Sequence, residues 1–170
     1  MITYHVADIE STTLLTQLWV DSFTQAYQGI HSPENIQSYC LDNFSREAAE
    51  LVLTNDKMVC TIATRNSKPV GLTIIHHHSC PLKMQVNSSE LKQIYLLSSE
   101  YGSGLGKSMI ENGFEIMREA DHDWAWLCVS DLNYRAQKFY RKAEFNPIGE
   151  GPILEVGTDR LKSLIMIKRL

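Results

Sequence analysis

The chain has 170 residues, of which 44% are hydrophobic and 21% charged, and its formal net charge is −4. This length and composition are typical of one globular domain, which we place at residues 1–170, and no repeat or low-complexity tract divides it. The negative balance excludes the basic surplus typical of nucleic-acid-binding proteins, and without a signal peptide or a long apolar run we expect a cytoplasmic protein with no membrane partner.

The first part of the chain is predicted to form a short strand and three helices. Residues 1–7 are typical of an edge strand, and apolar residues recur at helical spacing over residues 9–27. Ser32-Pro33-Glu34 combines a capping serine with a proline at the first helical position, which predicts a helix reaching residue 41. A third helix is predicted from Ser45 to about residue 53.

The remaining chain is predicted to alternate strands and helices. The expected elements are a strand at 58–64, a turn at 66–69, strands at 70–76 and 91–97, a helix at 107–119, a strand at 124–129 and a helix at 133–142. Residues 151–157 and 163–170 are predicted to pair as a closing hairpin. This order predicts a mixed α/β domain with a crossover helix.

A glycine-rich segment, Tyr101-Gly102-Ser103-Gly104-Leu105-Gly106-Lys107, links a predicted strand to a predicted helix, and we call it the glycine loop. Its glycines permit a sharp turn and close approach of a ligand, and the N–H groups at the helix start suit a pyrophosphate. The spacing is one residue short of a nucleoside-triphosphate loop, and it does not match the dinucleotide fingerprint. From the loop alone, a tight turn without a ligand is the alternative.

A second motif follows downstream of the glycine loop. Residues 126–129 form an apolar strand, and Asn133, Ala136 and the pair Phe139-Tyr140 follow at regular spacing. Taken with the glycine loop and the strand before it, this segment resembles the paired motifs of the GCN5-related N-acetyltransferase (GNAT) family.

The chain departs from the family pattern at two positions. The first family motif is Arg/Gln-x-x-Gly-x-Gly/Ala; Gly104 and Gly106 match it, whereas Tyr101 stands where Arg or Gln is usual. This departure removes one side-chain contact to the pyrophosphate but leaves the backbone amides. The second motif usually ends in Gly-Phe, and here it ends in Glu144-Phe145, which indicates a less strained turn or a local rearrangement.

The resemblance implies a single-domain GNAT-like fold, with a central, mostly antiparallel sheet and helices on both faces. It implies acetyl-CoA as cosubstrate, no metal, and transfer of the acetyl group to a primary amine of a small molecule by direct attack in a ternary complex. Flanking segments at 31–35 and 165–168 are similar to the PaiA-like group, associated with polyamine acetylation, so a polyamine is the first acceptor considered. A protein or peptide amine, and a catalytically weak acetyl-CoA sensor, are the alternatives, and a homodimer stays open.

The resemblance also implies roles for individual residues. Tyr140 matches a tyrosine that protonates the leaving sulfur, with simple core packing as its alternative. Glu90 stands where some members place a catalytic base, although a solvated glutamate at a strand end is an equal alternative. The N–H of Leu96 would polarise the thioester carbonyl. The other expected cofactor-binding residues are Tyr101, Gly102, Ser103, Gly104, Leu105, Gly106, Lys107, Asn133 and Lys142.

Three consecutive histidines, His76 to His78, lie outside these motifs. Successive side chains on a strand point to opposite faces, so the three cannot bind one metal ion in a regular strand. We therefore expect a solvated strand end, with proton transfer by His77 as the alternative. Tyr27 and Tyr95 are further candidates for lining the amine pocket, although core packing is the stronger explanation for Tyr27.

Overall fold

The computed structural model describes residues 1–81 and 84–170. Its elements in chain order are β1 (Ile2–Val6), η1 (Ile9–Ser11), α1 (Thr12–Tyr27), α2 (Pro33–Asn43), α3 (Arg46–Thr54), β2 (Met58–Arg65), β3 (Lys68–His76), β4 (Ser88–Leu96), η2 (Ser98–Glu100), α4 (Leu105–Glu119), β5 (Trp124–Ser130), α5 (Tyr134–Lys142), β6 (Asn146–Glu150), β7 (Leu154–Val156), β8 (Asp159–Leu161) and β9 (Ser163–Arg169). Up to α5, every helix and strand expected from the sequence is present. None of the described helices combines the length and apolarity needed to cross a membrane.

Seven strands form one sheet in the order β1-β2-β3-β4-β5-β9-β6, and only the β4–β5 pair is parallel. The sheet is therefore mostly antiparallel and β1 lies at its edge, which confirms both expectations. The parallel pair exists because α4 carries the chain from the end of β4 back to the start of β5, as a crossover helix does.

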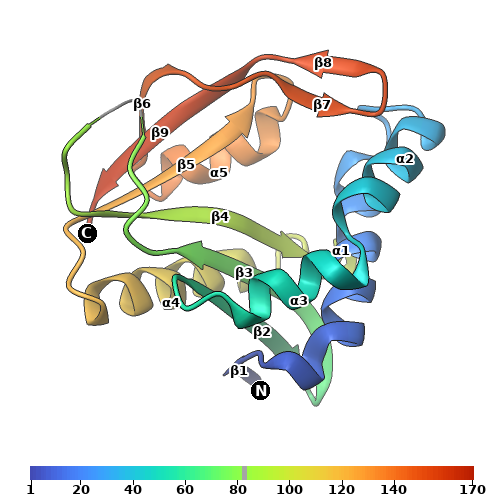
Figure 1. Cartoon of the computed structure of the whole chain (residues 1–170), viewed down its shortest axis with the longest axis horizontal. Helices are drawn as coiled ribbons and strands as arrows, with labels where there is room; N and C mark the ends of the chain where they lie inside the picture. The colour runs from blue at the N-terminus through green and yellow to red at the C-terminus, as the bar shows by residue number, and fades with distance from the viewer. Residues whose placement is uncertain (82–83) are drawn as a thin grey trace.

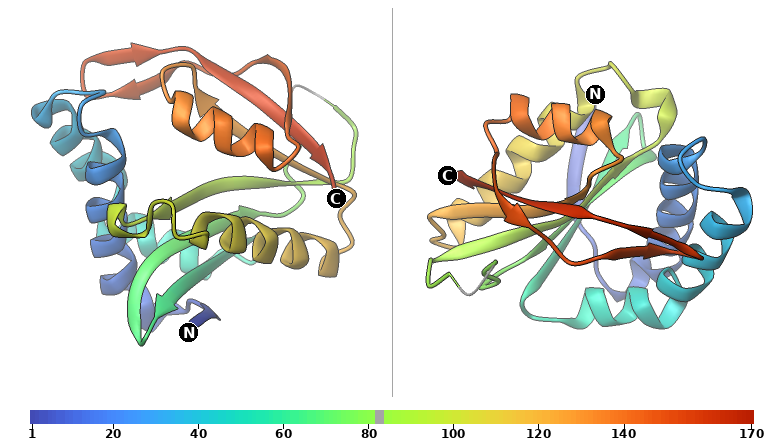
Figure 2. Two further views of the ribbon diagram at one scale, coloured as in Figure 1. Left: turned by 180° about the vertical axis from the view of Figure 1, so that it is seen from behind. Right: turned by 90° about the horizontal axis from the view of Figure 1, so that it is seen from above.

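Helices cover both faces of the sheet, as expected (Figure 2). α1, α2 and α3 pack on one face, where Trp19 stacks on Phe44 with ring centroids 5.1 Å apart. α4 and α5 pack on the other face, where Phe114 and Phe145 are almost fully buried. The two apolar layers hold the central strands between them and fix the ends of β4 and β5.

The helix starts follow from local capping. The hydroxyl of Ser32 accepts a hydrogen bond from Asn35 N at 3.2 Å, and that of Ser45 accepts one from Ala48 N at 3.1 Å. Each bond satisfies an amide of the first turn that has no helical partner. Both helix starts predicted from the sequence are thereby confirmed.

The expected closing hairpin of residues 151–157 and 163–170 is wrong. Residues 163–169 form β9, which pairs with β5 on one side and β6 on the other, and β7 pairs with β8 instead. Gly157 has a φ of +58°, so a two-residue turn at Gly157-Thr158 closes a short hairpin before the chain reaches Ser163. Because of this local turn, β7 pairs with β8, although the sequence predicted that the β7 segment would pair with the segment that forms β9.

Glu144 occupies the turn in which the family usually has glycine. Its φ is +69°, in the left-handed region, and the amide of Phe145 donates to the carbonyl of Tyr140 at 3.0 Å. This is the hydrogen-bond pattern of a Schellman motif at the C-terminal end of α5. The less strained turn indicated by the sequence is therefore wrong: Glu144 adopts the glycine conformation. The side chain of Lys168 holds its carboxylate at 2.6 Å.

This strain can be measured by comparing Glu144→Gly with Glu144→Ala. Both variants lose the ion pair to Lys168, so the difference between them reports the backbone alone. Because an L-residue in the left-handed region costs about 1 kcal/mol, we expect the glycine variant to have the larger free energy of unfolding by about that amount. Urea denaturation would measure it, and equal stability of the two variants would contradict the strain.

Candidate functional site

The two parallel strands, β4 and β5, separate part-way along their length. Their pairing ends at Glu90 and Trp126, although β4 continues to Leu96 and β5 to Ser130. Figure 1 shows the strands diverging toward α1. We call the space between them the wedge; it opens at the carboxyl ends of both strands, a common position for ligands in sheets with parallel strands.

One edge of β4 faces the wedge with its backbone groups beyond the last pair to β5. The N–H of Leu97 donates to the carbonyl of Val70 on the β3 side at 2.9 Å. Along an antiparallel ladder successive N–H groups alternate in direction, so those of Ile94 and Leu96 point toward β5. The register shift in this ladder precedes Gln93 and leaves this alternation intact. Leu96 was expected from the sequence; Ile94 was missed, and the strand alternation is the signal that identifies it.

The glycine loop leads from β4 into α4. Gly102 and Gly104 have φ angles of +80° and +84°, a backbone conformation that glycine adopts at no steric cost. A Cβ atom built on either residue would meet no atom within 4 Å. Gly104 has no side chain to cap α4, and although the Leu105 amide donates to Ser103, the other amides of the first turn face this open space. Open space before the start of a helix suits an anionic group such as a phosphate.

A partly buried ion pair supports the glycine loop from behind. Arg65, the last residue of β2, donates from Nη2 to Glu100 Oε2 at 2.7 Å and from Nε to the same oxygen at 3.0 Å. The hydroxyl of Ser103 donates to Glu100 at 3.1 Å and accepts from Leu105 N at 3.3 Å. The Arg65 guanidinium lowers the pKa of Glu100, so this carboxylate stays ionised. The Ser103 side chain therefore supports the loop instead of facing its open side.

α5 begins at the opposite side of the wedge. The side chain of Asn133 caps this helix by accepting from Ala136 N at 3.1 Å. Further along α5, the partly buried ring of Tyr140 packs between Phe139 and Phe145, with centroids 5.4 and 6.0 Å away. Burial raises the pKa of Tyr140, so its hydroxyl stays protonated and able to donate.

Three tyrosines from three elements meet near the wedge: Tyr27 of α1, Tyr95 of β4 and Tyr140 of α5. Burial raises the pKa of Tyr27, while Asn133 and Tyr95, which lie beside its hydroxyl, lower it. The pKa of Tyr95 is raised by burial first, and also by Tyr27 and Tyr140. The three hydroxyls are thus close enough to influence one another, and all remain neutral donors. The ring of Tyr27 also packs on the ring of Phe23, with centroids 4.4 Å apart, so Tyr27 is part of the core as well.

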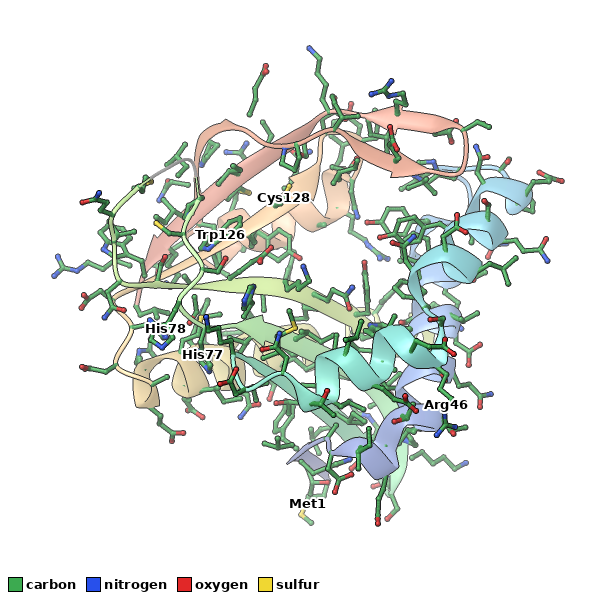
Figure 3. All side chains as sticks on the ribbon, in the orientation of Figure 1. Met1, Arg46, His77, His78, Trp126 and Cys128 are labelled. Atoms are coloured by element: carbon green, nitrogen blue, oxygen red, sulfur yellow. The ribbon has the colours of Figure 1, made fainter. Side chains whose placement is uncertain are left out.

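A pocket of about 340 Å³ lies where β4 and β5 are still paired, and we call it the acidic pocket. Two carboxylates, Glu90 and Glu150, line it together with Trp126 and Cys128 of β5. Figure 3 labels Trp126 and Cys128. Cys128 also raises the pKa of Tyr27, so the acidic pocket and the tyrosines are neighbours. Glu90 is mostly buried, and its Oε2 lies 3.7 Å from His76 Nδ1. Glu90 therefore lines a pocket and does not stand free at a strand end.

The histidine run is only partly solvated. His78 is exposed, whereas His77 is partly buried and stacks on His122 with centroids 5.2 Å apart. Burial lowers the pKa of both His77 and His122, which keeps them neutral. Across residues 1–81 and 84–170, no group of three or more His, Cys, Asp or Glu residues is arranged to hold a metal ion.

The two lysines expected to bind the cofactor lie in different places. Lys107 is exposed in the first turn of α4, beside the glycine loop. Lys142 is exposed near the end of α5, nine residues after Asn133 and so about 13 Å from the helix start. There it lines an open groove with Lys138 and Arg141. The structure therefore joins Lys107 to the loop but places Lys142 apart from it.

Comparison with known sequences decides the family. The model of the Acetyltransferase (GNAT) family matches residues 14–145, a stretch that includes the glycine loop, the wedge and Tyr140. The chain belongs to the GNAT family. This confirms the resemblance seen in the two sequence motifs and makes the protein an acetyltransferase.

Individual relatives of this GNAT acetyltransferase are distant. An uncharacterized N-acetyltransferase of Mycobacterium tuberculosis is 25% identical over 143 residues, which cover 82% of this chain and 85% of the relative. The PaiA N-acetyltransferase of Thermoplasma acidophilum, in complex with coenzyme A, shares the fold with a TM-score of 0.79 and 21% identity over 100% of this chain and 99% of that one. The ribosomal-protein-S18-alanine N-acetyltransferase of Escherichia coli has a TM-score of 0.67 at 16% identity, over 99% and 94% of the two chains.

Sequence reasoning missed the ion pair that supports the glycine loop of this acetyltransferase. Arg65 and Glu100 are 35 residues apart, and neither belongs to a motif. They meet because Arg65 ends β2 and Glu100 ends η2, and the ends of these two elements lie side by side just before the glycine loop. In the sequence, a glutamate next to a glycine-rich turn indicates such an ion pair only weakly, and nothing around Arg65 indicates it.

Proposed function

We propose that this acetyltransferase moves the acetyl group of acetyl-CoA to a primary amine of a small molecule, with a polyamine as the first candidate. The observation that carries the proposal is the wedge between β4 and β5. It has amide donors on one wall, the phenol of Tyr140 nearby and a pocket with two carboxylates at its closed end.

The donor would be held by backbone groups along one side of the wedge. The first-turn amides of α4 after Leu105 and the open space before Gly102 and Gly104 suit the pyrophosphate. The N–H groups of Ile94 and Leu96 suit the pantetheine and thioester end, because they point into the wedge. Bound there, acetyl-CoA supplies an acetyl group activated as a thioester.

The residues of the wedge divide the chemistry between them. The N–H groups of Ile94 and Leu96 donate to the negative charge that develops on the carbonyl oxygen as the amine nitrogen bonds to the carbonyl carbon. Tyr140 donates its proton to the sulfur as the carbon–sulfur bond breaks. The ammonium loses one proton before attack and the new amide nitrogen loses a second, which replaces the proton that Tyr140 gave up. One proton is released for each amine acetylated.

The acidic pocket supports an amine acceptor. Glu90 and Glu150 present two negative charges, and Trp126 offers an aromatic face to an alkylammonium chain. At about 340 Å³ the pocket has the size of a small-molecule site. Glu90 would attract the cation and accept its proton, directly or through water, while a second ammonium of a polyamine would pair with Glu150.

Thiol release from acetyl-CoA with a panel of amines tests this function. We expect spermidine and diamines to be acetylated faster than monoamines, and Glu90→Gln to raise the KM for spermidine about tenfold without changing the KM for acetyl-CoA. Glu111→Gln, an exposed substitution on α4, is the matched control. Activity on peptides alone would assign a protein acceptor instead. Thermal stabilisation by acetyl-CoA without acetylation of any amine would indicate a sensor.

A further inference from the structure

The glycine loop is poor in positive charge. Of the residues from Tyr101 to Lys107 only Lys107 is charged, and the nearby Arg65 is already committed to Glu100. A diphosphate carries about two negative charges at neutral pH, so the loop amides and one exposed lysine leave part of that charge without a cationic partner.

A second cation approaches the loop from the other side of the wedge. Arg135, in the first turn of α5, places its Cζ 3.8 Å from the centroid of the Tyr101 ring. At this distance the guanidinium lies on the face of the ring, and the contact joins the element after β5 to the loop after β4. The positive charge of Arg135 also lowers the pKa of Tyr27 slightly, against the larger rise caused by burial.

The N–H groups of Arg135 are free to bind a ligand. Within residues 1–81 and 84–170, no carboxylate lies within 4 Å of its guanidinium, and none of the side-chain hydrogen bonds that the described residues make involves it. Stacking on an aromatic face leaves the five N–H donors at the edge of the planar group unused. A guanidinium held flat in this way is ordered in advance for two parallel bonds to phosphate oxygens.

Tyr101 acts here through its ring. Its hydroxyl is buried and makes no hydrogen bond to the described residues, so packing and the cation, not the phenol oxygen, fix the position of the ring. Tyr101 is the residue that departs from the Arg or Gln usual in the family, and the cation that the loop lacks lies directly on it.

We propose that Arg135, held on the Tyr101 ring, binds the diphosphate of the coenzyme A donor and supplies from α5 the charge that the glycine loop lacks. This inference rests on the proposed function, because it requires coenzyme A in the wedge. It adds a binding residue and gives Tyr101 the role of a platform for that residue.

Calorimetric titration with coenzyme A, dephospho-coenzyme A and pantetheine tests the proposal without a need for turnover. We expect Arg135→Gln to weaken coenzyme A and dephospho-coenzyme A by the same factor, at least about tenfold, and to leave pantetheine unchanged. Tyr101→Ala removes the platform and should weaken the same two ligands, and Tyr101→Phe, which keeps the ring, should restore the affinity lost in Tyr101→Ala. Lys138→Gln, exposed on the same helix, removes an equal charge and should have little effect.

A double variant gives the sharpest comparison. Tyr101→Arg in the Arg135→Gln background returns a cation to the loop, and we expect it to recover most of the lost affinity for coenzyme A. Wild-type affinity in Arg135→Gln would overturn the inference, as would a loss confined to coenzyme A, which would assign Arg135 to the 3′-phosphate. If the wild-type protein binds no coenzyme A, the proposed function fails and this inference fails with it.

Discussion

Replacing Tyr140 with phenylalanine should lower kcat at least about tenfold and leave the affinity for coenzyme A unchanged. The substitution removes one oxygen from a ring that packs between Phe139 and Phe145 and keeps that packing. Only the proton donor to the leaving sulfur is lost. Steady-state kinetics at saturating substrate, together with calorimetry, would measure the two effects separately.

The pH profile provides a second test of the same role. Burial raises the pKa of Tyr140, and the nearby Tyr27 raises it further, so the hydroxyl is protonated at and above neutral pH. A donor with a raised pKa is lost only as the pH rises past that pKa, so Tyr140 should produce no fall in activity below about pH 10. Tyr134→Phe is the matched control, since Tyr134 is exposed on the same helix. An unchanged kcat in Tyr140→Phe would exclude the proton-donor role.

Replacing Gly104 with valine should abolish measurable binding of coenzyme A. Gly104 has a φ of +84° and stands immediately before α4, where a Cβ would project into open space. That space is where the pyrophosphate would approach the helix amides, so the side chain would occupy the position of the ligand. Calorimetric titration of the purified variant would measure the loss.

The chain contains a control for the strain that this valine introduces. Gly29, in the turn between α1 and α2, has a φ of +88° and also has no atom within 4 Å of a built Cβ. Both valine variants should lower the free energy of unfolding by about 1–2 kcal/mol, but Gly29→Val should not affect coenzyme A binding. Retained binding in Gly104→Val, or equal losses in both variants, would exclude the loop as the pyrophosphate site.

The order of helices and strands could be read from the sequence up to α5. Serine caps at Ser32 and Ser45, apolar periodicity and the turn at Asn66-Ser67 are local signals, and each corresponds to an observed boundary. After α5 the prediction failed, because β9 selects its partners β5 and β6 from distant parts of the chain. The turn at Gly157 pairs β7 with its near neighbour β8, so β7 does not pair with β9.

The candidate site was only partly predictable. The glycine loop, Asn133 and Tyr140 belong to contiguous motifs, so the sequence identified them before any coordinates. Glu150 and Arg135 carry no such signal. They contribute through the acidic pocket and the Tyr101 ring, and both arrangements depend on how elements after β5 approach β4.

By itself, the sequence determined the family, the local elements and the position of the glycine loop, because periodicity, caps and motif spacing depend on residues that are near neighbours in the chain. The tertiary structure decided the wedge, the acidic pocket where β4 and β5 are still paired, and the ion pair between Arg65 and Glu100 behind the glycine loop. It also decided that Glu144 would accept a glycine conformation. These features arise where segments far apart in the chain pack together, and packing selects contacts by shape and charge that local spacing does not encode.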